Sequence, residues 1–392
     1  MSIEIIQFDN KNKKMLKKFV KFAWVLYKGD EKWVPQLNME LLGNKIFKAV
    51  GLLTAEHPFH EHGEVTYFLA VQNGKTVGRI AGIVNHAHIE YHEEKAGFFG
   101  FFETIDNGEV VKLLLDNVYQ WLKSKGMEIM RGPANFSSNE SWGLLVENFD
   151  DYPMVYTPYN KKYYEKLLLE YGFTKSMDLI GMFMRAQDVK EEDRERRARL
   201  EKISNRVKQK HGITVRPVRL DKKSFHEEVG YIRHIYQNAW EKNWGFIPIT
   251  EHEFDDAAVG MQMMLKPGLA SLAFVNDEPA GFIVNLPDVN EISRLKKSIF
   301  GNSDLIRAIR VMLKKKNQKR VRLLLFGIVN KYRKIGLDSV LFVDSFRNAQ
   351  ELGIEDCEIS WLLETNTLVI RHGEAMNAYE YRKWRLYDYP LR

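Results

Sequence analysis

The stretch 321–353, VRLLLFGIVNKYRKIGLDSVLFVDSFRNAQELG, decides the fold. It begins as an apolar strand, passes through a basic turn that ends in Gly336, and continues with apolar residues at helical spacing. The start of a helix carries unpaired N–H groups and a partial positive charge. Three cations, Lys331, Arg333 and Lys334, stand just before it. The combination predicts an anion site, and phosphate is an anion that helix N-termini commonly bind.

The composition is that of an ordinary folded protein. The chain has 392 residues, 45% apolar and 28% charged, and its length favours two domains. The single cysteine, Cys357, cannot form an intramolecular disulfide, and the first residues lack the pattern of a signal peptide, so we expect a cytoplasmic protein. A net charge of +6 permits anionic ligands but does not by itself argue for nucleic acid.

The order of predicted elements repeats on either side of a charged segment, 187–212, which is predicted to be an exposed helical linker. Each half contains a hairpin, at 68–85 and 271–285, with turn residues at matching positions. A strand and a helix that ends in glycine come after each hairpin, at 97–126 and 321–353. The pattern predicts a duplicated domain, with an N-terminal copy at 1–186 and a C-terminal copy at 213–392.

The element order β-α-α-β-β-β-α-β-α-β, found twice, resembles the GNAT (GCN5-related N-acetyltransferase) superfamily in tandem. The NKYRKIGLD turn, the SWLLETN strand and the GPANFSSN loop resemble a bacterial tandem-GNAT family of mostly unassigned substrate. The resemblance implies an α+β fold of two GNAT-like domains, each a mixed, mainly antiparallel sheet flanked by helices. It also implies a transferase in which an amine attacks the thioester of acyl-CoA directly.

In the superfamily, the turn Gln/Arg-x-x-Gly-x-Gly/Ala holds the pyrophosphate of coenzyme A through backbone amides, and Arg333 and Gly336 match it. The resemblance implies a binding site for acetyl-CoA or a longer acyl-CoA formed by Gly327, Ile328, Val329, Lys331, Arg333, Lys334, Gly336, Leu337, Asp338 and Asn366. Asp338 departs from the pattern: it would cap the helix but repel a pyrophosphate, which leaves open that it is only an N-cap. Asn366 has the same N-cap alternative.

The first half lacks these cations. Its equivalent turn, ETIDNGEVV at 103–111, is acidic, so we expect the N-terminal domain to have no CoA site of its own.

Strand 357–364 supplies candidate catalytic groups. Alternation places Glu358, Ser360 and Glu364 on one face, where either glutamate could act as the general base or belong to a salt-bridged pair. The acid that protonates the thiolate is often a tyrosine in the superfamily; of the four tyrosines after 378 we choose Tyr379, although each could equally be packing. Cys357 is interpreted as a small core residue.

The loop 131–149 gathers hydrogen-bonding groups between apolar stretches. We predict that it binds the acceptor near the junction of the domains, through Asn135, Ser137, Asn139 and Trp142. An ordinary surface loop would have a similar composition.

Two further patterns bear on partners. Histidines at 57–62 and 86–92 lack a completing cysteine or acid, so no metal is expected. The basic run 314–322 is interpreted first as a solvated helix end, then as a contact to the 3′-phosphate of CoA, and third as an RNA or membrane patch. We expect a small-molecule amine acceptor; nucleic acid is not favoured, peripheral membrane contact stays open, and the oligomeric state is not readable.

Three functions are compatible with these patterns. The favoured one is an N-acyltransferase, with acyl-CoA in the C-terminal domain. The alternatives are a non-catalytic GNAT-derived module that binds a CoA thioester or another phosphorylated ligand, and a transferase fed by aminoacyl-tRNA.

Overall fold

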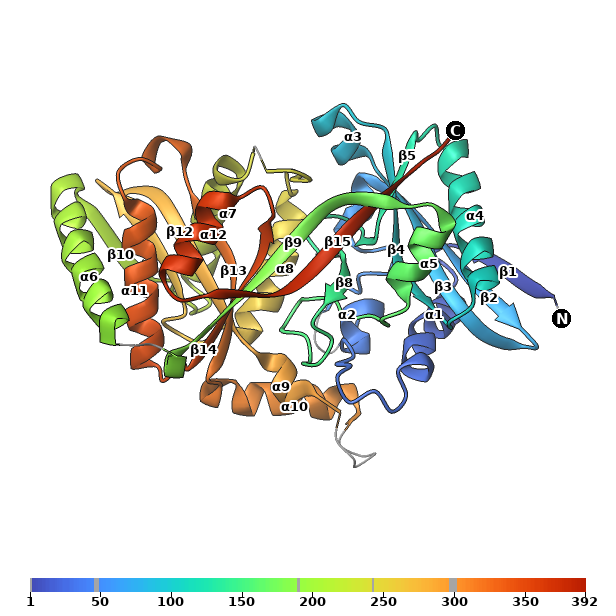
Figure 1. The fold of residues 1–392 in the computed structure, drawn as a ribbon, viewed down its shortest axis with the longest axis horizontal. Helices are drawn as coiled ribbons and strands as arrows, with labels where there is room; N and C mark the ends of the chain where they lie inside the picture. The colour runs from blue at the N-terminus through green and yellow to red at the C-terminus, as the bar shows by residue number, and fades with distance from the viewer. Residues whose placement is uncertain (1, 46–48, 189–190, 242, 296–301) are drawn as a thin grey trace. The chain divides into compact units, whose positions relative to one another are not determined.

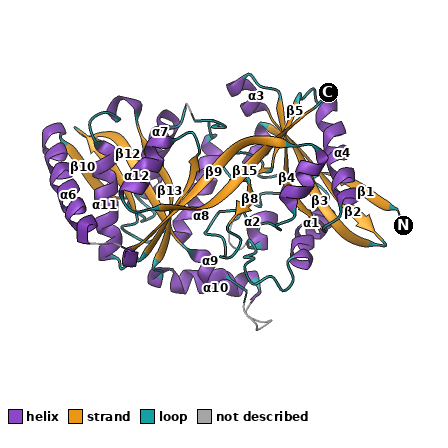
Figure 2. Ribbon diagram, in the orientation of Figure 1, coloured by secondary structure: helices purple, strands orange, loops and turns teal. Residues whose placement is uncertain are grey.

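The computed structural model describes residues 2–45, 49–188, 191–241, 243–295 and 302–392 (Figures 1 and 2). The chain forms two compact units. Unit 1 comprises 1–179, 294–308 and 382–392, and unit 2 comprises 180–293 and 309–381. The units are therefore not contiguous in sequence, whereas the predicted domains 1–186 and 213–392 were each one uninterrupted stretch.

Unit 1 is a mixed sheet with helices. Its strand order is β1-β2-β3-β4-β5, followed by the C-terminal part of β15, and β8 also pairs with β15. Neighbours from β1 to β4 are antiparallel, and β4 and β5 are parallel. The strands are β1 (Ile3–Phe8), β2 (Gly63–Gln72), β3 (Lys75–Asn85), β4 (Ala96–Thr104), β5 (Ile129–Gly132), β8 (Leu144–Glu147) and β15 (Tyr379–Pro390). The helices are α1 (Lys13–Leu26), α2 (Asn38–Leu42), α3 (His86–His92), α4 (Gly108–Ser124) and α5 (Tyr164–Tyr171).

Unit 2 repeats this plan with strand order β10-β11-β12-β13-β14, in which only the pairing of β13 with β14 is parallel. Its strands are β10 (Ile213–Pro217), β11 (Ala270–Val275), β12 (Glu278–Pro287), β13 (Arg320–Ile328) and β14 (Asp356–Leu363). Its helices are α6 (Glu191–His211), α7 (Phe225–Ala239), α8 (Glu251–Met264), α9 (Val289–Ser293), α11 (Leu337–Glu351) and α12 (Thr367–Ala375). Three of these elements contribute to both units: β9 (Thr174–Arg185), α10 (Asp304–Lys314) and β15.

The predicted hairpin turns and helix ends have the backbone geometry that their sequences favour. Asn73 and Gly74 connect β2 to β3 with φ of 52° and 71°, and Asn276 and Asp277 connect β11 to β12 with φ of 48° and 66°. Positive φ at both central residues is typical of the type I′ turn. The structure thus confirms an α+β fold of two units, each with a mixed, mainly antiparallel sheet and helices.

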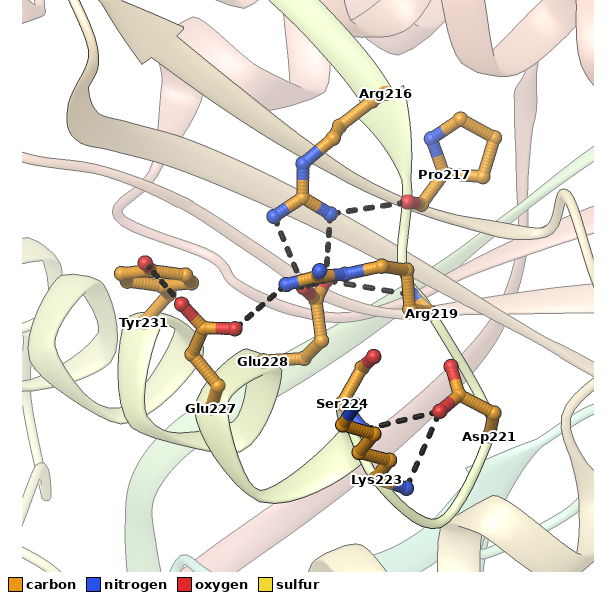
Figure 3. A network of polar contacts seen from close by, with 9 residues as sticks. All are labelled: Arg216, Pro217, Arg219, Asp221, Lys223, Ser224, Glu227, Glu228 and Tyr231. Atoms are coloured by element: carbon orange, nitrogen blue, oxygen red, sulfur yellow. Dashed lines mark hydrogen bonds and ion pairs between the residues drawn. The ribbon is translucent and has the colours of Figure 1, made fainter.

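Buried charges attach the helices to the sheet of unit 2. Glu228 of α7 is fully buried and accepts hydrogen bonds from Arg216 at 2.7 and 2.9 Å and from Arg219 Nε at 2.7 Å (Figure 3). The two guanidinium groups hold the pKa of the Glu228 carboxyl below its usual range, although burial opposes them. The predicted linker helix, α6, also packs on unit 2, where Lys208 pairs with Asp344 at 2.5 Å. We therefore describe α6 as part of unit 2.

A central strand pair diverges in each unit. In unit 2, β13 pairs with β14 from Arg320↔Asp356 to Leu323↔Ile359, but it continues beside β12 as far as Ile328. In unit 1, β4 pairs with β5 only from Ala96↔Ile129 to Phe98↔Arg131 and continues beside β3 to Thr104. In both units the strands separate just before the helix that follows, α4 in unit 1 and α11 in unit 2.

Candidate functional site

The predicted anion site is built by the end of β13, the turn 329–336 and the start of α11. Gly336 is the N-cap of α11 in the left-handed conformation, with φ of +84°. A residue with a Cβ is strained there, which explains the glycine. No side-chain hydrogen bond from the described residues caps the helix at this position. The first N–H groups of α11 therefore keep their capacity to bind an anion.

The three predicted cations have different surroundings. Lys331 forms an ion pair with Glu278, which also accepts a hydrogen bond from Tyr332 OH at 2.5 Å. These contacts lower the pKa of the Glu278 carboxyl. Arg333 donates to the carbonyl oxygens of Ala239 and Ile328, the latter at 3.5 Å, so it holds the turn against the end of α7. Lys334 is exposed on the turn.

The interpretation of Asp338 as the N-cap is wrong, because Gly336 occupies that position. Asp338 lies one residue inside the helix, and its Oδ2 is 3.9 Å from Nδ1 of His372 on α12. Two helices thus bring a carboxylate and an imidazole together beside the start of α11. The sequence does not signal this pair, because Asp338 and His372 are more than thirty positions apart.

Glu358 lies in a closed polar cluster inside unit 2. It is fully buried and accepts hydrogen bonds from Tyr381 OH and, at 2.5 Å, from Ser360 Oγ. Arg322 Nε lies 3.8 Å from the carboxylate and donates to Ser360 Oγ at 2.9 Å, and its guanidinium covers the Trp361 ring at 4.8 Å. A carboxylate enclosed in this way is suited to positioning its neighbours and has little access to a substrate ammonium.

The other predicted catalytic residues lie outside this cluster. Glu364 comes directly after the last residue of β14 and is half-buried. Tyr379 is exposed, with its ring 6.3 Å from that of Phe183, so Tyr381 rather than Tyr379 reaches Glu358. Asn366 precedes α12 without a side-chain capping bond. Burial raises the pKa of the Cys357 thiol to about 12, which leaves little thiolate to act as a nucleophile at neutral pH.

In unit 1, a short hairpin occupies the place where β4 and β5 diverge. It consists of β6 (Ala134–Asn135) and β7 (Ser141–Trp142). Asn135 Oδ1 accepts the backbone N–H of Phe101 at 2.7 Å, and a Cβ on Gly100 would lie 1.9 Å from the Ala134 carbonyl oxygen. Phe136 is fully buried and stacks on Phe59 at 4.5 Å. The hairpin therefore fills the equivalent of the predicted cofactor position.

The predicted acceptor-binding residues are engaged within that hairpin. Ser137 Oγ donates to Glu140 at 2.6 Å and accepts the N–H of Asn139 at 3.1 Å. Trp142 is buried. Together with the bond of Asn135 to β4, these contacts give the loop a structural role inside unit 1.

Glu103 also fills space in unit 1. It lies near the end of β4 and accepts hydrogen bonds from Tyr27 OH at 2.8 Å and Tyr164 OH at 2.6 Å, with Arg79 at 3.8 Å. Burial raises the pKa of the Glu103 carboxyl although Arg79 lowers it. Sheet register pairs Glu103 with Arg79 and Gly327 with Phe282, so the repeat has a glycine in unit 2 where unit 1 has this glutamate.

The described residues were also compared with what a metal site and a membrane-spanning helix require. Among those residues, no three His, Cys, Asp or Glu side chains are placed together to hold a metal ion. Among the same residues, no helix is both long and apolar enough to span a membrane.

Comparison with solved structures identifies the fold. The chain is similar over its full length to a solved tandem GNAT protein from the clavulanic acid biosynthesis pathway (TM-score 0.55, 7% identity, 99% of that chain). It is also similar to a probable N-acyltransferase from Enterococcus faecalis V583 (TM-score 0.50, 8% identity, 100% of this chain and 73% of that one). The fold is therefore that of the tandem GNAT acyltransferases.

Sequence comparison narrows the class to a family, although no protein-family model matches the chain. Protein YghO of Escherichia coli is 30% identical over 384 residues, 96% of this chain and 93% of its own. The bacterial ceramide synthase of Caulobacter vibrioides is also 30% identical over 384 residues, 96% of this chain and 95% of its own. The chain belongs to the family of these two proteins.

Proposed function

We propose that this protein is an N-acyltransferase that moves an acyl group from acyl-CoA to an amine, with the cofactor bound by unit 2. The observation that carries the proposal is the divergence of β13 and β14 directly before the uncapped, glycine-started helix α11. The pyrophosphate would lie on the N–H groups around Gly336, and the acyl thioester would extend beside the end of β13. The filled position in unit 1 supports a single cofactor site per chain.

The bacterial ceramide synthase supports a long-chain substrate class. A ceramide is the amide of a fatty acid with a long-chain amino alcohol, and that relative is similar over 96% of this chain. We infer that the acyl donor is a long-chain acyl-CoA rather than acetyl-CoA, and that the acceptor is a long-chain amino alcohol.

The reaction needs a base, an anion-stabilising group and a leaving thiol. His372 takes a proton from the ammonium of the acceptor, and Asp338 orients its imidazole. The amine nitrogen then attacks the thioester carbon, backbone N–H groups at the end of β13 stabilise the oxyanion, and the C–S bond breaks as the C–N bond forms. The thiolate of CoA is protonated as it leaves. Glu364 and Tyr379 remain candidate acid–base groups, whereas Glu358 acts as a positioning residue.

Calorimetric titration with palmitoyl-CoA, acetyl-CoA and CoA tests the cofactor site. We expect palmitoyl-CoA to bind most tightly, one per chain, and Lys334→Glu to weaken it about tenfold through repulsion of the phosphates. Lys210→Glu, an equal charge change at another exposed lysine of unit 2, is the matched control. Equal affinity in both variants would exclude the turn as the phosphate site.

Product analysis tests the chemistry. With palmitoyl-CoA and sphinganine we expect the N-acylated amine by mass spectrometry, with one thiol released per amide. His372→Gln should lower kcat at least about a hundredfold while the affinity for palmitoyl-CoA stays unchanged. Tight cofactor binding without any amide product, from sphinganine or from a panel of other amines, would favour the non-catalytic alternative.

A further inference from the structure

Helix α10 (Asp304–Lys314) exposes its apolar face to solvent, whereas an ordinary surface helix buries that face. Its large apolar residues are exposed: Leu313 is 75% and Met312 54% exposed, and Leu305, Ile306 and Ile309 are exposed as well. At about 100° per residue these five positions lie within an arc of about 120° on one face of the helix. An ordinary surface helix turns such a face toward the core.

Two polar residues in the first half of α10, Arg307 and Asp304, face the protein instead. Arg307, which belongs to unit 1, is 1% exposed and donates to the carbonyl oxygen of Pro35 in the same unit. Asp304, in the first turn, accepts hydrogen bonds from Asn38 Nδ2 and from the N–H of Met39, both at 3.2 Å. Because these polar contacts hold the start of the helix, its apolar face is directed outward by specific bonds.

A second apolar surface lies next to the end of α10 within unit 2. Lys315, immediately after the helix, donates to the carbonyl oxygen of Met263 at the end of α8. Val259 and Met263, one turn apart on α8, are both exposed. Exposed apolar side chains on two elements that this bond connects indicate a contact with a partner or with lipid.

The positive charge near this surface favours an anionic lipid bilayer over a protein as its partner. The stretch 304–320 contains seven Lys or Arg residues, of which Arg307 is buried, and one acidic residue, Asp304. Arg310 borders the apolar face, and Lys314 and Lys319 lie exposed at and beyond the end of the helix. An apolar face bordered by cations has the chemistry of helices that lie in the interface of an anionic bilayer.

We propose that α10, with Val259 and Met263 of α8, is a membrane-docking surface that inserts its apolar side chains between the headgroups of anionic phospholipids. The surface does not include the turn 329–336 or His372, so this inference is independent of the proposed acyl transfer. The protein binds the bilayer peripherally and reversibly, because the contact area is one short helix and one neighbouring turn.

Co-sedimentation of the full chain with vesicles tests the proposal. We expect binding to vesicles of phosphatidylglycerol and phosphatidylethanolamine, and binding to pure phosphatidylcholine at least about fivefold weaker. The double variant Met312→Glu with Leu313→Glu should lower partitioning into anionic vesicles at least about tenfold, because it places charge on the inserted face. Both side chains are exposed, so the variant should unfold at the temperature of the wild type.

A matched control carries the same charge change elsewhere. Leu169→Glu with Ile203→Glu replaces two similarly exposed apolar residues on α5 and α6 and should bind vesicles as the wild type does. Lys314→Glu should weaken binding to anionic vesicles and leave binding to phosphatidylcholine unchanged. The proposal is overturned if the wild type sediments with neither vesicle, if the α10 variant binds as tightly as the wild type, or if the control loses as much. Light scattering that shows a dimer, abolished by the α10 variant and unaffected by vesicles, would assign the surface to a second copy of the chain instead.

Discussion

At the scale of single residues, position in a buried network decides which acidic groups have access to a substrate. Glu358 was a candidate base because alternation put it on a polar face with Ser360. The structure shows that Arg322, Ser360 and Tyr381 enclose it. His372 and Asp338 are partly exposed and lie beside the start of α11. The chemical type of a residue was readable in sequence, but its accessibility was not.

Glu358→Gln should destabilise the protein strongly, by about 3–5 kcal/mol, because it leaves the buried Arg322 without a compensating charge. Urea denaturation monitored by fluorescence gives the free energy of unfolding. Glu364→Gln, in the same segment but half-buried, should cost less than about 1 kcal/mol. If Glu358→Gln folds as stably as the wild type but abolishes turnover, Glu358 is a catalytic base after all.

Asp288 gives unit 2 a pH-dependent stability. Burial raises the pKa of its carboxyl to about 7, although Arg320 at 4.0 Å lowers it, and Glu358 and Glu291 add to the rise. Between the ordinary pKa of aspartate, about 4, and 7 the folded state binds more protons at Asp288 than the unfolded state does, so this group makes stability fall as pH rises through that window.

Asp288→Asn should therefore stabilise the protein more at pH 8 than at pH 5. The measurement is the urea midpoint at both values, with the wild type alongside. Asp356→Asn is a comparison variant that should show a smaller effect in the same direction, because burial also raises the pKa of this partly buried aspartate of β14. A stability difference between Asp288→Asn and the wild type that is independent of pH would show that Asp288 does not titrate in this range.

At the scale of elements, the two copies of the strand–turn–helix passage have different roles. In both copies the two strands of a parallel pair separate, β4 from β5 and β13 from β14. In unit 1 the β6–β7 hairpin occupies the space between the separated strands. The lack of cations in the first turn is visible in the sequence. The hairpin that fills the divergence could not be predicted, because its contacts with β4 join residues more than thirty positions apart, as in the bond from Phe101 to Asn135.

Phe136→Ala should cost about 3–5 kcal/mol, because it empties a fully buried aromatic site between Phe59 and Phe101. Under conditions where the variant is folded, palmitoyl-CoA should still bind with a stoichiometry of one. A stoichiometry of two would show that removing the ring opens a second cofactor site in unit 1.

At the scale of the whole molecule, each unit is built from segments that are separated in the sequence. The last eleven residues, 382–392, belong to unit 1, where β15 pairs with β5 and β8. The sequence repeat indicated two copies but placed their boundary in the charged segment 187–212. Which sheet a terminal strand joins depends on long-range pairing, which periodicity along the chain does not encode.

Trp384→Ala tests this division. The indole is fully buried and donates to the carbonyl oxygen of Pro158 at 3.0 Å, so its loss should cost about 3–5 kcal/mol. Hydrogen exchange should rise in β3, β4 and β5 and stay unchanged in β11, β12 and β13. The reverse distribution would support an uninterrupted domain from 213 to 392.

The sequence by itself determined the local elements, the duplication and the glycine at the start of the helix that follows the turn 329–336. These depend on interactions between residues close in the chain, such as hairpin turns, helix ends and the periodicity of apolar side chains. Only the tertiary structure decided that Arg333 holds the turn, that Asp338 meets His372, that Glu358 is enclosed, and that α10 turns its apolar face outward. Burial and pairing between distant segments set these properties, and neither can be read from a single stretch of sequence.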